Sequence, residues 1–354
     1  MPRWDYAWGS NTSPDERTAS VHTLGVVTLT FKLQCIVLAG VLVAFAGACD
    51  DGDGDADVAA DADTELPPTS ATIVVLPDTQ YYAHYYPQTF TAQVDWILQQ
   101  KASRRIAAVL HVGDVVDDPF VVSEWNVAGS AMRALDGKVP YLLVPGNHDM
   151  GYDRATLIDD YFSPDSMPWI TGTMTTGQIE NSYTLVDIGP TSWLVVGLEW
   201  GPRDATLVWA DQVLKAYADR PAIVVTHAYL NGGDGTRYQR PDQPFYPTGY
   251  TPEQGMNDGE MIWQKLVVPN GNVRLVLSGH YGVARQTSAR PDGSLVHEIV
   301  SDYQWWEGPE NGFGYLRTME FDYALMEIRV RTYSPTRKSF LTEDMHQFTL
   351  GLEL

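Results

Sequence analysis

The chain has 354 residues, which suffices for one large or two small domains, and its apolar content of 44% is ordinary for a globular protein. The formal charge is -22, from 45 acidic and 23 basic residues. This charge disfavours binding to nucleic acid, because the phosphate backbone would be repelled. The two cysteines, Cys35 and Cys49, both precede the region expected to fold, which excludes a disulfide framework and a cysteine-based metal site there.

Residues 1–49 are interpreted as an N-terminal extension that carries a signal segment. Residues 36–48 are all apolar or small, and this stretch suits a signal-peptide core better than a membrane span, which needs about 20 residues. Small residues directly before Cys49 resemble the cleavage site of bacterial lipoproteins, although Ala46 stands where leucine is commoner. An uncleaved anchor over residues 25–48 and ordinary secretion are the alternatives. We therefore expect a bacterial cell-envelope protein, either a lipoprotein lipidated at Cys49 on the outer or cytoplasmic membrane or a secreted protein, and not a cytoplasmic one.

Residues 50–70 are expected to form an acidic, disordered linker. They are rich in aspartate, glycine and alanine and end near Pro67-Pro68. More than a third of the net charge comes from eight carboxylates in this segment: Asp50, Asp51, Asp53, Asp55, Asp57, Asp61, Asp63 and Glu65. Their spacing lacks the loop and the distal glutamate of a helix–loop–helix calcium motif, so we interpret the segment as a solvated tether.

The folded region begins with alternating strands and helices. Apolar runs predict strands at residues 71–76, 106–112 and 139–144. Between them, helical periodicity predicts a helix at residues 88–101 and a second helix capped by Ser123, with Trp125 and Met132 on its apolar face. This order is typical of a parallel βαβ series.

The second half of the chain contains more hairpins. Strands are predicted at residues 183–186, 193–197, 222–226, 273–277, 286–288, 296–300 and 326–332, and helices at residues 256–266 and from a cap at Asp204. Residues 231–255 form a long loop, which we expect to shape a pocket. Two sheets packed face to face, with helices outside, suit this order. We predict a catalytic domain at residues 71–335 and a C-terminal tail, residues 336–354, that packs on it.

Five of the predicted strands end on a residue that can bind a metal or a phosphate. These residues are Asp78, Asp114, Asn147 (followed by His148 and Asp149), His227 and His280. Ligands of open α/β sheets bind beyond the carboxyl ends of the strands, so these side chains are expected to meet. Carboxylate, amide and imidazole ligands without thiolate suit manganese, iron or zinc in a hydrolytic site. Two such ions about 3.5–4 Å apart can clamp a phosphate and activate water.

The motifs at these strand ends resemble those of the calcineurin-like metallophosphoesterases. That family carries Asp-x-His, Gly-Asp-x-x-Asp, Gly-Asn-His-Asp/Glu, an isolated His and Gly-His-x-His. The corresponding segments here are Asp78-Thr79-Gln80, Gly113-Asp114-Val115-Val116-Asp117, Gly146-Asn147-His148-Asp149, His227 and Gly279-His280-Tyr281-Gly282. The resemblance spans about residues 72–335 and is closest to a bacterial branch whose first motif reads Pro-Asp-Thr-Gln. It implies an α/β fold, a four-layer α/β/β/α sandwich of two mixed sheets flanked by helices.

The resemblance also implies a role for each motif residue. One or two divalent ions (manganese, iron or zinc) would be bound. Asp78 and Gln80 would bind the first ion, and Asp114 would bind both ions. The second ion would also be bound by Asn147, His227 and His280. His148 would face the phosphate as acid or electrostatic stabiliser, oriented by Asp149, and Asn147 would also contact the substrate. The nucleophile would be a metal-bound hydroxide.

Two positions depart from the family pattern, and both belong to the first metal. Gln80 stands where the family has a ligand histidine, and Gly282 stands where the last ligand histidine is expected. Either the first site is rebuilt with the amide oxygen of Gln80, which would favour a harder ion such as manganese, magnesium or iron(II), or it is weak or empty.

Several other residues are weaker candidates. Asp117 and His111 are predicted to support the ligands without binding metal, and Arg285 could reach a phosphate. His84 lies in an aromatic loop that could line the pocket, and Trp305-Trp306 could form an aromatic wall for an organic substituent. For each of these, a purely structural role is the alternative.

The sequence therefore predicts metal-dependent hydrolysis of a phosphomonoester or phosphodiester by a secreted or membrane-tethered protein. One alternative is a catalytically impaired metal- or phosphate-binding surface protein on the same scaffold. Another is a hydrolase that acts on a non-phosphate ester or a pyrophosphate bond. The predicted partners are a phosphate-ester substrate and the membrane, reached through an N-terminal lipid or anchor; no protein partner is evident from the sequence.

Overall fold

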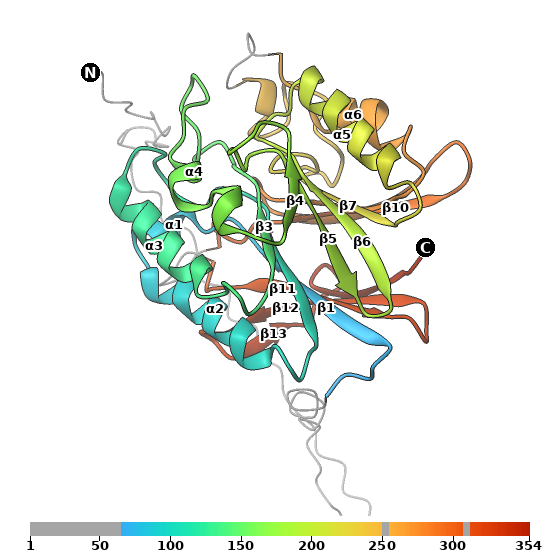
Figure 1. The fold of residues 1–354 in the computed structure, drawn as a ribbon, viewed down its shortest axis with the longest axis horizontal. Coiled ribbons are helices and arrows are strands. Elements are labelled where there is room, and N and C mark those ends of the chain that lie inside the picture. The colour runs from blue at the N-terminus through green and yellow to red at the C-terminus, as the bar shows by residue number, and fades with distance from the viewer. Residues whose placement is uncertain (1–64, 250–254, 307–311) are drawn as a thin grey trace, which may run out of the picture. The chain divides into compact units, whose positions relative to one another are not determined.

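The computed structural model describes residues 65–249, 255–306 and 312–354 (Figure 1). The predicted signal segment, Cys49 and most of the acidic linker lie outside these residues. Within the described part of the chain, every helix is too short or too polar to cross a membrane. The first strand begins at Ser70, close to the predicted start of the folded region.

One mixed sheet of seven strands contains the first three strands of the chain. β1 (Ser70–Leu76), β2 (Ile106–His111) and β3 (Tyr141–Leu143) run parallel, as the βαβ spacing predicts. On the other side of β1 lie antiparallel strands from the end of the chain: β11 (Leu316–Asp322), β12 (Glu327–Ser334), β13 (Ser339–Leu341) and β14 (Gln347–Gly351). Both β13 and β14 pair with β12, so residues 336–354 contribute strands to this sheet.

The second mixed sheet also has seven strands, in the order β4-β5-β6-β7-β8-β10-β9. Their bounds are β4 (Ile170–Thr173), β5 (Ser182–Ile188), β6 (Thr191–Gly197), β7 (Ala222–Val225), β8 (Val273–Ser278), β9 (Val283–Ala289) and β10 (Leu295–Ser301). The strands predicted at residues 183–186 and 193–197 form the β5–β6 hairpin, and those predicted at residues 286–288 and 296–300 form the β9–β10 hairpin. In addition, β6, β7, β8 and β10 run parallel to one another, so their carboxyl ends share one edge.

Helices cover the outer face of each sheet (Figure 1). α1 (Gln80–His84), α2 (Pro87–Gln100) and α3 (Val122–Arg133) lie beside the first sheet, followed by the short α4 (Ile158–Tyr161) and a 3₁₀ turn at Pro164–Ser166. α5 (Asp204–Ala216), α6 (Gly259–Ile262) and a π-helical turn at Trp263–Val267 cover the second sheet, and a 3₁₀ turn lies at Pro247–Gly249. The architecture is the predicted α/β/β/α sandwich.

The helix caps differ from the sequence prediction. α3 begins at Val122 after the N-cap residue Val121, so Ser123 lies inside the first turn. α5 begins at Asp204 itself, and its carboxylate accepts hydrogen bonds from Lys265 and Asn257. Because Asp204 is the first helical residue, Arg203 takes the N-cap position, and its side chain makes no capping hydrogen bond.

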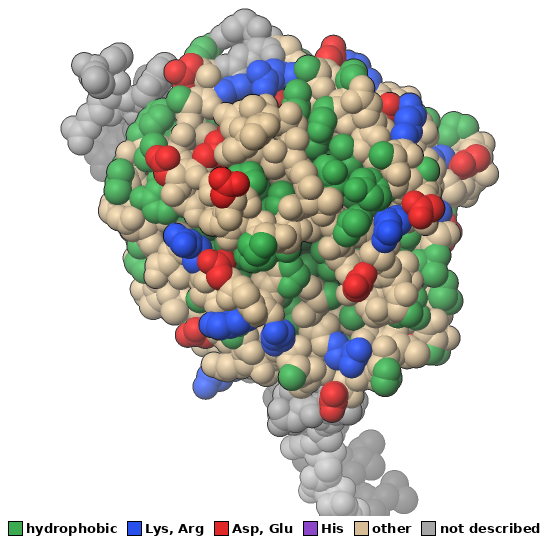
Figure 2. Space-filling view, viewed as in Figure 1, with side chains coloured by type: hydrophobic (Ala, Val, Ile, Leu, Met, Phe, Trp, Pro, Cys, Tyr) green, Lys and Arg blue, Asp and Glu red, His purple; other side chains and the backbone are tan. Residues whose placement is uncertain are grey.

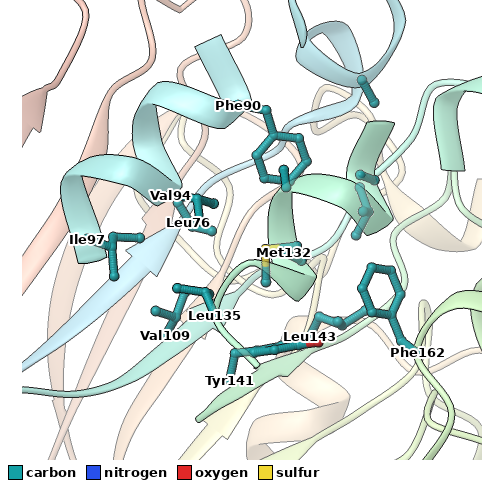
Figure 3. Close-up of a cluster of buried hydrophobic side chains, with 14 of the residues drawn as sticks. Leu76, Phe90, Val94, Ile97, Val109, Met132, Leu135, Tyr141, Leu143 and Phe162 are labelled. Atoms are coloured by element: carbon teal, nitrogen blue, oxygen red, sulfur yellow. The ribbon is translucent and has the colours of Figure 1, made fainter. Parts of the chain in front are cut away.

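Three layers of apolar side chains hold the four layers together. Along β1 the side chains alternate, as a pleated strand requires: Val74 and Leu76 face the helices, whereas Ile73 and Val75 face the second sheet. In Figure 3, Phe90, Val94 and Ile97 of α2 pack over Leu76 and Val109, with Met132 and Leu135 beside them. A third cluster joins α5 and the Trp263–Val267 turn to β6, β7, β8 and β10.

The surface of the folded part carries both signs of charge. On the face drawn in Figure 2, acidic and basic side chains are interspersed. Much of the negative excess in the sequence comes instead from the linker segment before Leu66. The net charge of -22 is therefore a poor description of this face.

Leu142 on β3 offers a test of the contact between the two sheets. Its side chain is buried among residues of both sheets and lies opposite Gly197 of β6. We expect Leu142→Ala to lower the free energy of unfolding by about 2–5 kcal/mol, because the residue loses apolar burial and leaves a cavity. Chemical denaturation measures the change. Leu325→Ala, at a side chain that is 60% exposed, is the matched control and should change it by about 0.5 kcal/mol or less.

Candidate metal centre

Three ligand residues from both sheets converge at the carboxyl ends of parallel strands. Asp114 follows β2 in the first sheet, and His227 and His280 follow β7 and β8 in the second. One ligand atom from each lies within 4.8 Å of the other two, and all three residues are buried. Three residues that lie far apart in the sequence thus form one group that could hold a metal ion.

The orientation of both imidazoles is fixed by backbone carbonyls. His227 donates Nδ1–H to the carbonyl of Val112 at 2.8 Å, which turns Nε2 toward Asp114 Oδ2 at 3.2 Å. His280 donates Nε2–H to the carbonyl of Phe245 at 2.7 Å, so it would bind an ion through Nδ1. Metal-binding histidines usually donate their second N–H in this way, which fixes both the tautomer and the direction of the ring.

Buried polar atoms without a protein partner indicate that the group fits a divalent cation. Among the described residues, Asn147 Oδ1 and Gln80 Oε1 are buried and accept no hydrogen bond, whereas His227 Nε2 faces the Asp114 carboxylate at 3.2 Å. Buried polar atoms in folded proteins are nearly always satisfied, so two of them on predicted ligands need an explanation. A divalent ion, held by Asp114, Asn147, His227 and His280, would satisfy the Asn147 oxygen.

The motif glycines allow the ligand loops to approach each other. Gly113 has φ +100°, and a Cβ there would lie 2.6 Å from His227 Nδ1. A Cβ on Gly146 would lie 2.0 Å from Asp114 Oδ1, and one on Gly279 would lie 2.2 Å from Asp78 Oδ1. Asp114 and His280 themselves adopt positive φ, at 51° and 78°. Such strain is characteristic of functional sites, where the surrounding contacts enforce it.

His148 lies beside this group and is held by Asp117. Its backbone N–H donates to Asp114 Oδ1 at 2.9 Å, and its Nδ1–H donates to the carbonyl of Asp117 at 2.8 Å. The Asp117 carboxylate is 3.3 Å from the same nitrogen. On its other side, this carboxylate lies 3.4 Å from His84 Nδ1, and His84 also pairs with Glu124 at 2.8 Å. Asp117 therefore fixes the orientation of the His148 ring.

The predicted role of Asp149 needs correction. Its carboxylate does not orient His148; it accepts the backbone N–H groups of Val115, Val116 and Gly146 at 2.7–3.0 Å. Asp149 is fully buried and ties the turn after β2 to the turn after β3. The reason is geometric: consecutive residues in this tight turn point in different directions, so the neighbour in sequence is not the neighbour of the ring.

Electrostatics give the histidines of the site different protonation states. Burial alone would raise the pKa of Asp114, but the nearby His227 and His148 bring it below its ordinary value. Burial, helped by His227, lowers the pKa of His280 to about 3 and keeps it neutral. For His148, burial acts to lower the pKa, but Asp114 and Asp117 outweigh it and raise the pKa to about 10. Burial also acts to lower the pKa of His227, but Asp114 outweighs it and raises that pKa, so a metal ion bound at Nε2 would displace a proton. The site thus combines an ionised carboxylate with one histidine whose pKa is lowered and two whose pKa values are raised.

A second group of polar side chains surrounds Asp78. Its carboxylate accepts the His280 backbone N–H at 3.0 Å and is 3.3 Å from Gln304 Nε2. Gln304 and Asp302 were not predicted as site residues, and both are buried behind β10. They follow a strand end, as the candidate ligands do. The sequence predicts a strand at residues 296–300, but only the parallel pairing of β10 with β8 brings the end of β10 to this edge.

The remaining candidates divide into residues near the site and residues engaged elsewhere. His111 accepts the Gly113 N–H at 3.2 Å and contacts Thr79 Oγ1 at 2.9 Å, so it supports two ligand loops. Arg285, predicted to reach a phosphate, instead lies over the ring of Phe348 on β14, with its Cζ 4.2 Å from the ring centroid. This correction follows from the pleat of β9, which directs Arg285 toward the other sheet.

The aromatic residues near the site also divide into two kinds. Trp305 stacks on Phe245 with ring centroids 5.6 Å apart and is 37% exposed, so it could contact a substrate. Trp306 instead packs against Tyr303 and Tyr315. The predicted aromatic wall therefore reduces to Trp305 and its neighbours.

Gly113 allows a test of the link between backbone conformation and metal binding. We expect Gly113→Ala to displace His227 and to reduce bound metal by one ion per chain, because the added Cβ would clash with the imidazole. Elemental analysis of the purified protein measures this. Gly137→Ala is the matched control: Gly137 also has positive φ, at 67°, but a Cβ there meets nothing within 4 Å. Both variants should lose about 1–3 kcal/mol of stability, and equal metal content in both would contradict the assignment.

Comparison with known proteins agrees with the motifs. The model of the calcineurin-like phosphoesterase family matches residues 71–283. The uncharacterized protein YvnB of Bacillus subtilis (strain 168) is 35% identical over 313 residues. That match covers 82% of this chain but 22% of YvnB, so the chain spans about a fifth of the length of this relative.

Two solved structures are similar at much lower identity. Purple acid phosphatase PPD1 from yellow lupin (Lupinus luteus) seeds has a TM-score of 0.48 at 14% identity, covering 81% of this chain and 55% of its own. GAP50, the anchor in the inner membrane complex of Plasmodium, has a TM-score of 0.45 at 11% identity, covering 80% of this chain and 90% of its own. The family match over residues 71–283, which is more than half of the sequence, shows that this chain belongs to the calcineurin-like phosphoesterase family.

Proposed function

We propose that this protein hydrolyses a phosphate ester, either a monoester or a diester, with one or two divalent metal ions. The observation that supports this most strongly is the convergence of Asp114, His227 and His280, whose ligand atoms lie within 4.8 Å of one another. His148 lies directly beside this group, through its hydrogen bond to Asp114. A site that only bound metal would not need a histidine held in place beside the group by Asp117.

Each residue has a defined part in this proposal. When bound, a divalent pair supplies charge stabilisation for the phosphate and a nucleophile derived from water. Asp114 would contact both ions, and Asn147, His227 and His280 would complete the second. His148, held at Nδ1 by Asp117, would direct its other nitrogen to the phosphate or the leaving group and donate a proton there. Trp200 and Tyr238, with ring centroids 5.0 and 5.8 Å from His280, limit the access of water from behind.

A binding protein without turnover is the second candidate. The absence of histidine at Gln80 and Gly282 favours it, because both positions belong to the first metal. Under this alternative the scaffold would bind one ion or a phosphate group at the histidine-containing site and release it unchanged. The ordered His148–Asp117–His84 contacts support the enzyme instead, since they hold a proton donor in place without touching a predicted metal ligand other than Asp114.

His148 separates the two candidates. We expect His148→Ala to reduce hydrolysis of p-nitrophenyl phosphate or bis(p-nitrophenyl) phosphate by about 10²–10⁴-fold, the usual contribution of a general acid, while the metal content stays the same. His297→Ala is the matched control, because His297 bonds to Thr287 and to the carbonyl of Gly351, and it should retain activity. Unchanged turnover in His148→Ala would refute the role of His148 as general acid. No turnover in the parent protein after addition of manganese, iron or zinc would refute the proposed hydrolysis.

We also propose that the protein is tethered to the bacterial cell envelope through a lipid on Cys49. The apolar stretch at residues 36–48 and the small residues directly before Cys49 support this. The acidic linker at residues 50–70 would then hold the catalytic domain away from the membrane.

Replacement of Cys49 tests the tether. We expect Cys49→Ser to move the protein from the detergent-extracted membrane fraction to the soluble fraction of a bacterial host, and to abolish incorporation of labelled palmitate, because serine has no thiol to accept the lipid. Cys35→Ser, the other cysteine, is the control and should behave like the parent. A Cys49→Ser protein that stays in the membrane would favour the uncleaved anchor.

A further inference from the structure

Asp302 and Gln304 lie in the region where the family pattern lacks a ligand. They follow β10, which runs parallel to β8 with Val300 opposite Ser278, so both strands end at the same edge. Asp302 is fully buried and Gln304 is 5% exposed. Their position is therefore equivalent to that of His280, one strand further along the sheet.

The side chain of Asp302 lies against Gly282, the position of the missing histidine. The Asp302 backbone N–H donates to the Gly282 carbonyl at 2.9 Å, and the Gly282 N–H lies 3.3 Å from Asp302 Oδ2. Gly282 has φ +68°, a conformation that a histidine would adopt only with strain. The backbone at this position thus favours glycine, while a carboxylate from the neighbouring strand lies beside it.

Asp78 and Asp302 form a pair of buried carboxylates around one amide. Gln304 Nε2 is 3.3 Å from Asp78 Oδ2 and 3.4 Å from Asp302 Oδ2. Among the described residues, neither carboxylate has a lysine or arginine partner. Two buried carboxylates without a cation are unfavourable, and a metal ion between them would remove the repulsion.

Gln304 supplies an independent indication of a ligand. Its Oε1 atom is buried and accepts no hydrogen bond among the described residues, although its Nε2 atom lies between the two carboxylates. A half-turn of the amide exchanges these two atoms and places Oε1 between Asp78 and Asp302. Gln80 Oε1, two residues after Asp78, is likewise buried without a partner. Amide oxygens next to carboxylates are ligands for hard divalent ions.

We propose that Asp302, together with the amide oxygen of Gln304, replaces the missing histidines as ligands of the first metal ion. The first site then consists of oxygen ligands alone, from Asp78, Gln80, Asp114, Asp302 and Gln304, and it suits an ion of the Mg²⁺ or Mn²⁺ class. The second site keeps two imidazoles. This inference rests on the proposed hydrolytic function, and it makes the departures at Gln80 and Gly282 a rebuilt site.

The test is the number of Mn²⁺ ions bound by the full-length protein. Protein stripped with a chelator is titrated with Mn²⁺, and bound ions are counted by elemental analysis after gel filtration, with free Mn²⁺ followed by electron paramagnetic resonance. We expect two ions per chain for the parent and one for Asp302→Asn, which keeps the shape of the side chain but removes its charge. Gln304→Ala should weaken the same ion by at least tenfold.

Two controls separate loss of a ligand from loss of structure. Asp258→Asn alters another buried aspartate, which caps α6 by accepting the Met261 N–H, and it should still bind two ions. His227→Ala should lose the second ion and keep the first, and Asp302→Asn added to it should bind none. The metal-free melting temperature of Asp302→Asn should equal or exceed that of the parent, because the variant removes one of two repelling carboxylates.

The outcomes distinguish this inference from the proposed function. Two ions bound by Asp302→Asn with parental affinity would overturn the role of Asp302 and leave the hydrolytic proposal intact. One ion bound by the parent, retained in Asp302→Asn and lost in His227→Ala, would also overturn it, because the first site would not exist. No ion bound by the parent would overturn both proposals.

Discussion

The carboxylate of Asp114 is the point on which the geometry of the site depends. It is buried, it accepts the backbone N–H of His148, and it lies 3.2 Å from His227 Nε2 of the other sheet. Burying a charge is costly unless partners compensate for it, and here histidines supply that compensation. Because those partners come from separate loops, the position of each loop is tied to a single side chain. The two sheets must therefore pack in one register for the site to form.

The local backbone is shaped to make this contact possible. Gly113 and Asp114 have positive φ, and Gly146 lies close to the Asp114 carboxylate. A residue larger than glycine at position 113 or 146 would clash with His227 or with that carboxylate. Asp149 then holds the turns after β2 and β3 together through three backbone N–H groups. The apolar layer between the sheets packs against the strands from which these turns extend. The packing of the core therefore also determines where the turns of the site lie.

The site is asymmetric, and the asymmetry has a chemical meaning. One side presents two imidazoles whose second N–H groups are fixed by carbonyls. The other side presents the carboxylates of Asp78 and Asp302 on either side of the Gln304 amide. Imidazole suits transition metals, whereas oxygen ligands suit harder ions, so the two halves would differ in the ion they prefer. A departure from the family motif in one half therefore need not impair the other.

The sequence by itself determined the strand ends and the order of the motifs. Apolar runs that stop at Asp78, Asp114, Asn147, His227 and His280 are local signals, and parallel strands carry such residues to one edge of a sheet. The alternation of strands and helices, with hairpins near the end of the chain, was enough to predict two sheets flanked by helices.

Only the tertiary structure decided which residues hold each other. In the structure, His148 contacts Asp117 instead of Asp149, and Arg285 lies over Phe348. β11 pairs between β1 and β12, and Asp302 and Gln304 lie beside Asp78. The physical reason is that ligand motifs are set by local backbone conformation, which a short sequence can specify. Contacts across strands depend on register and pleat, which are fixed only when both sheets pack.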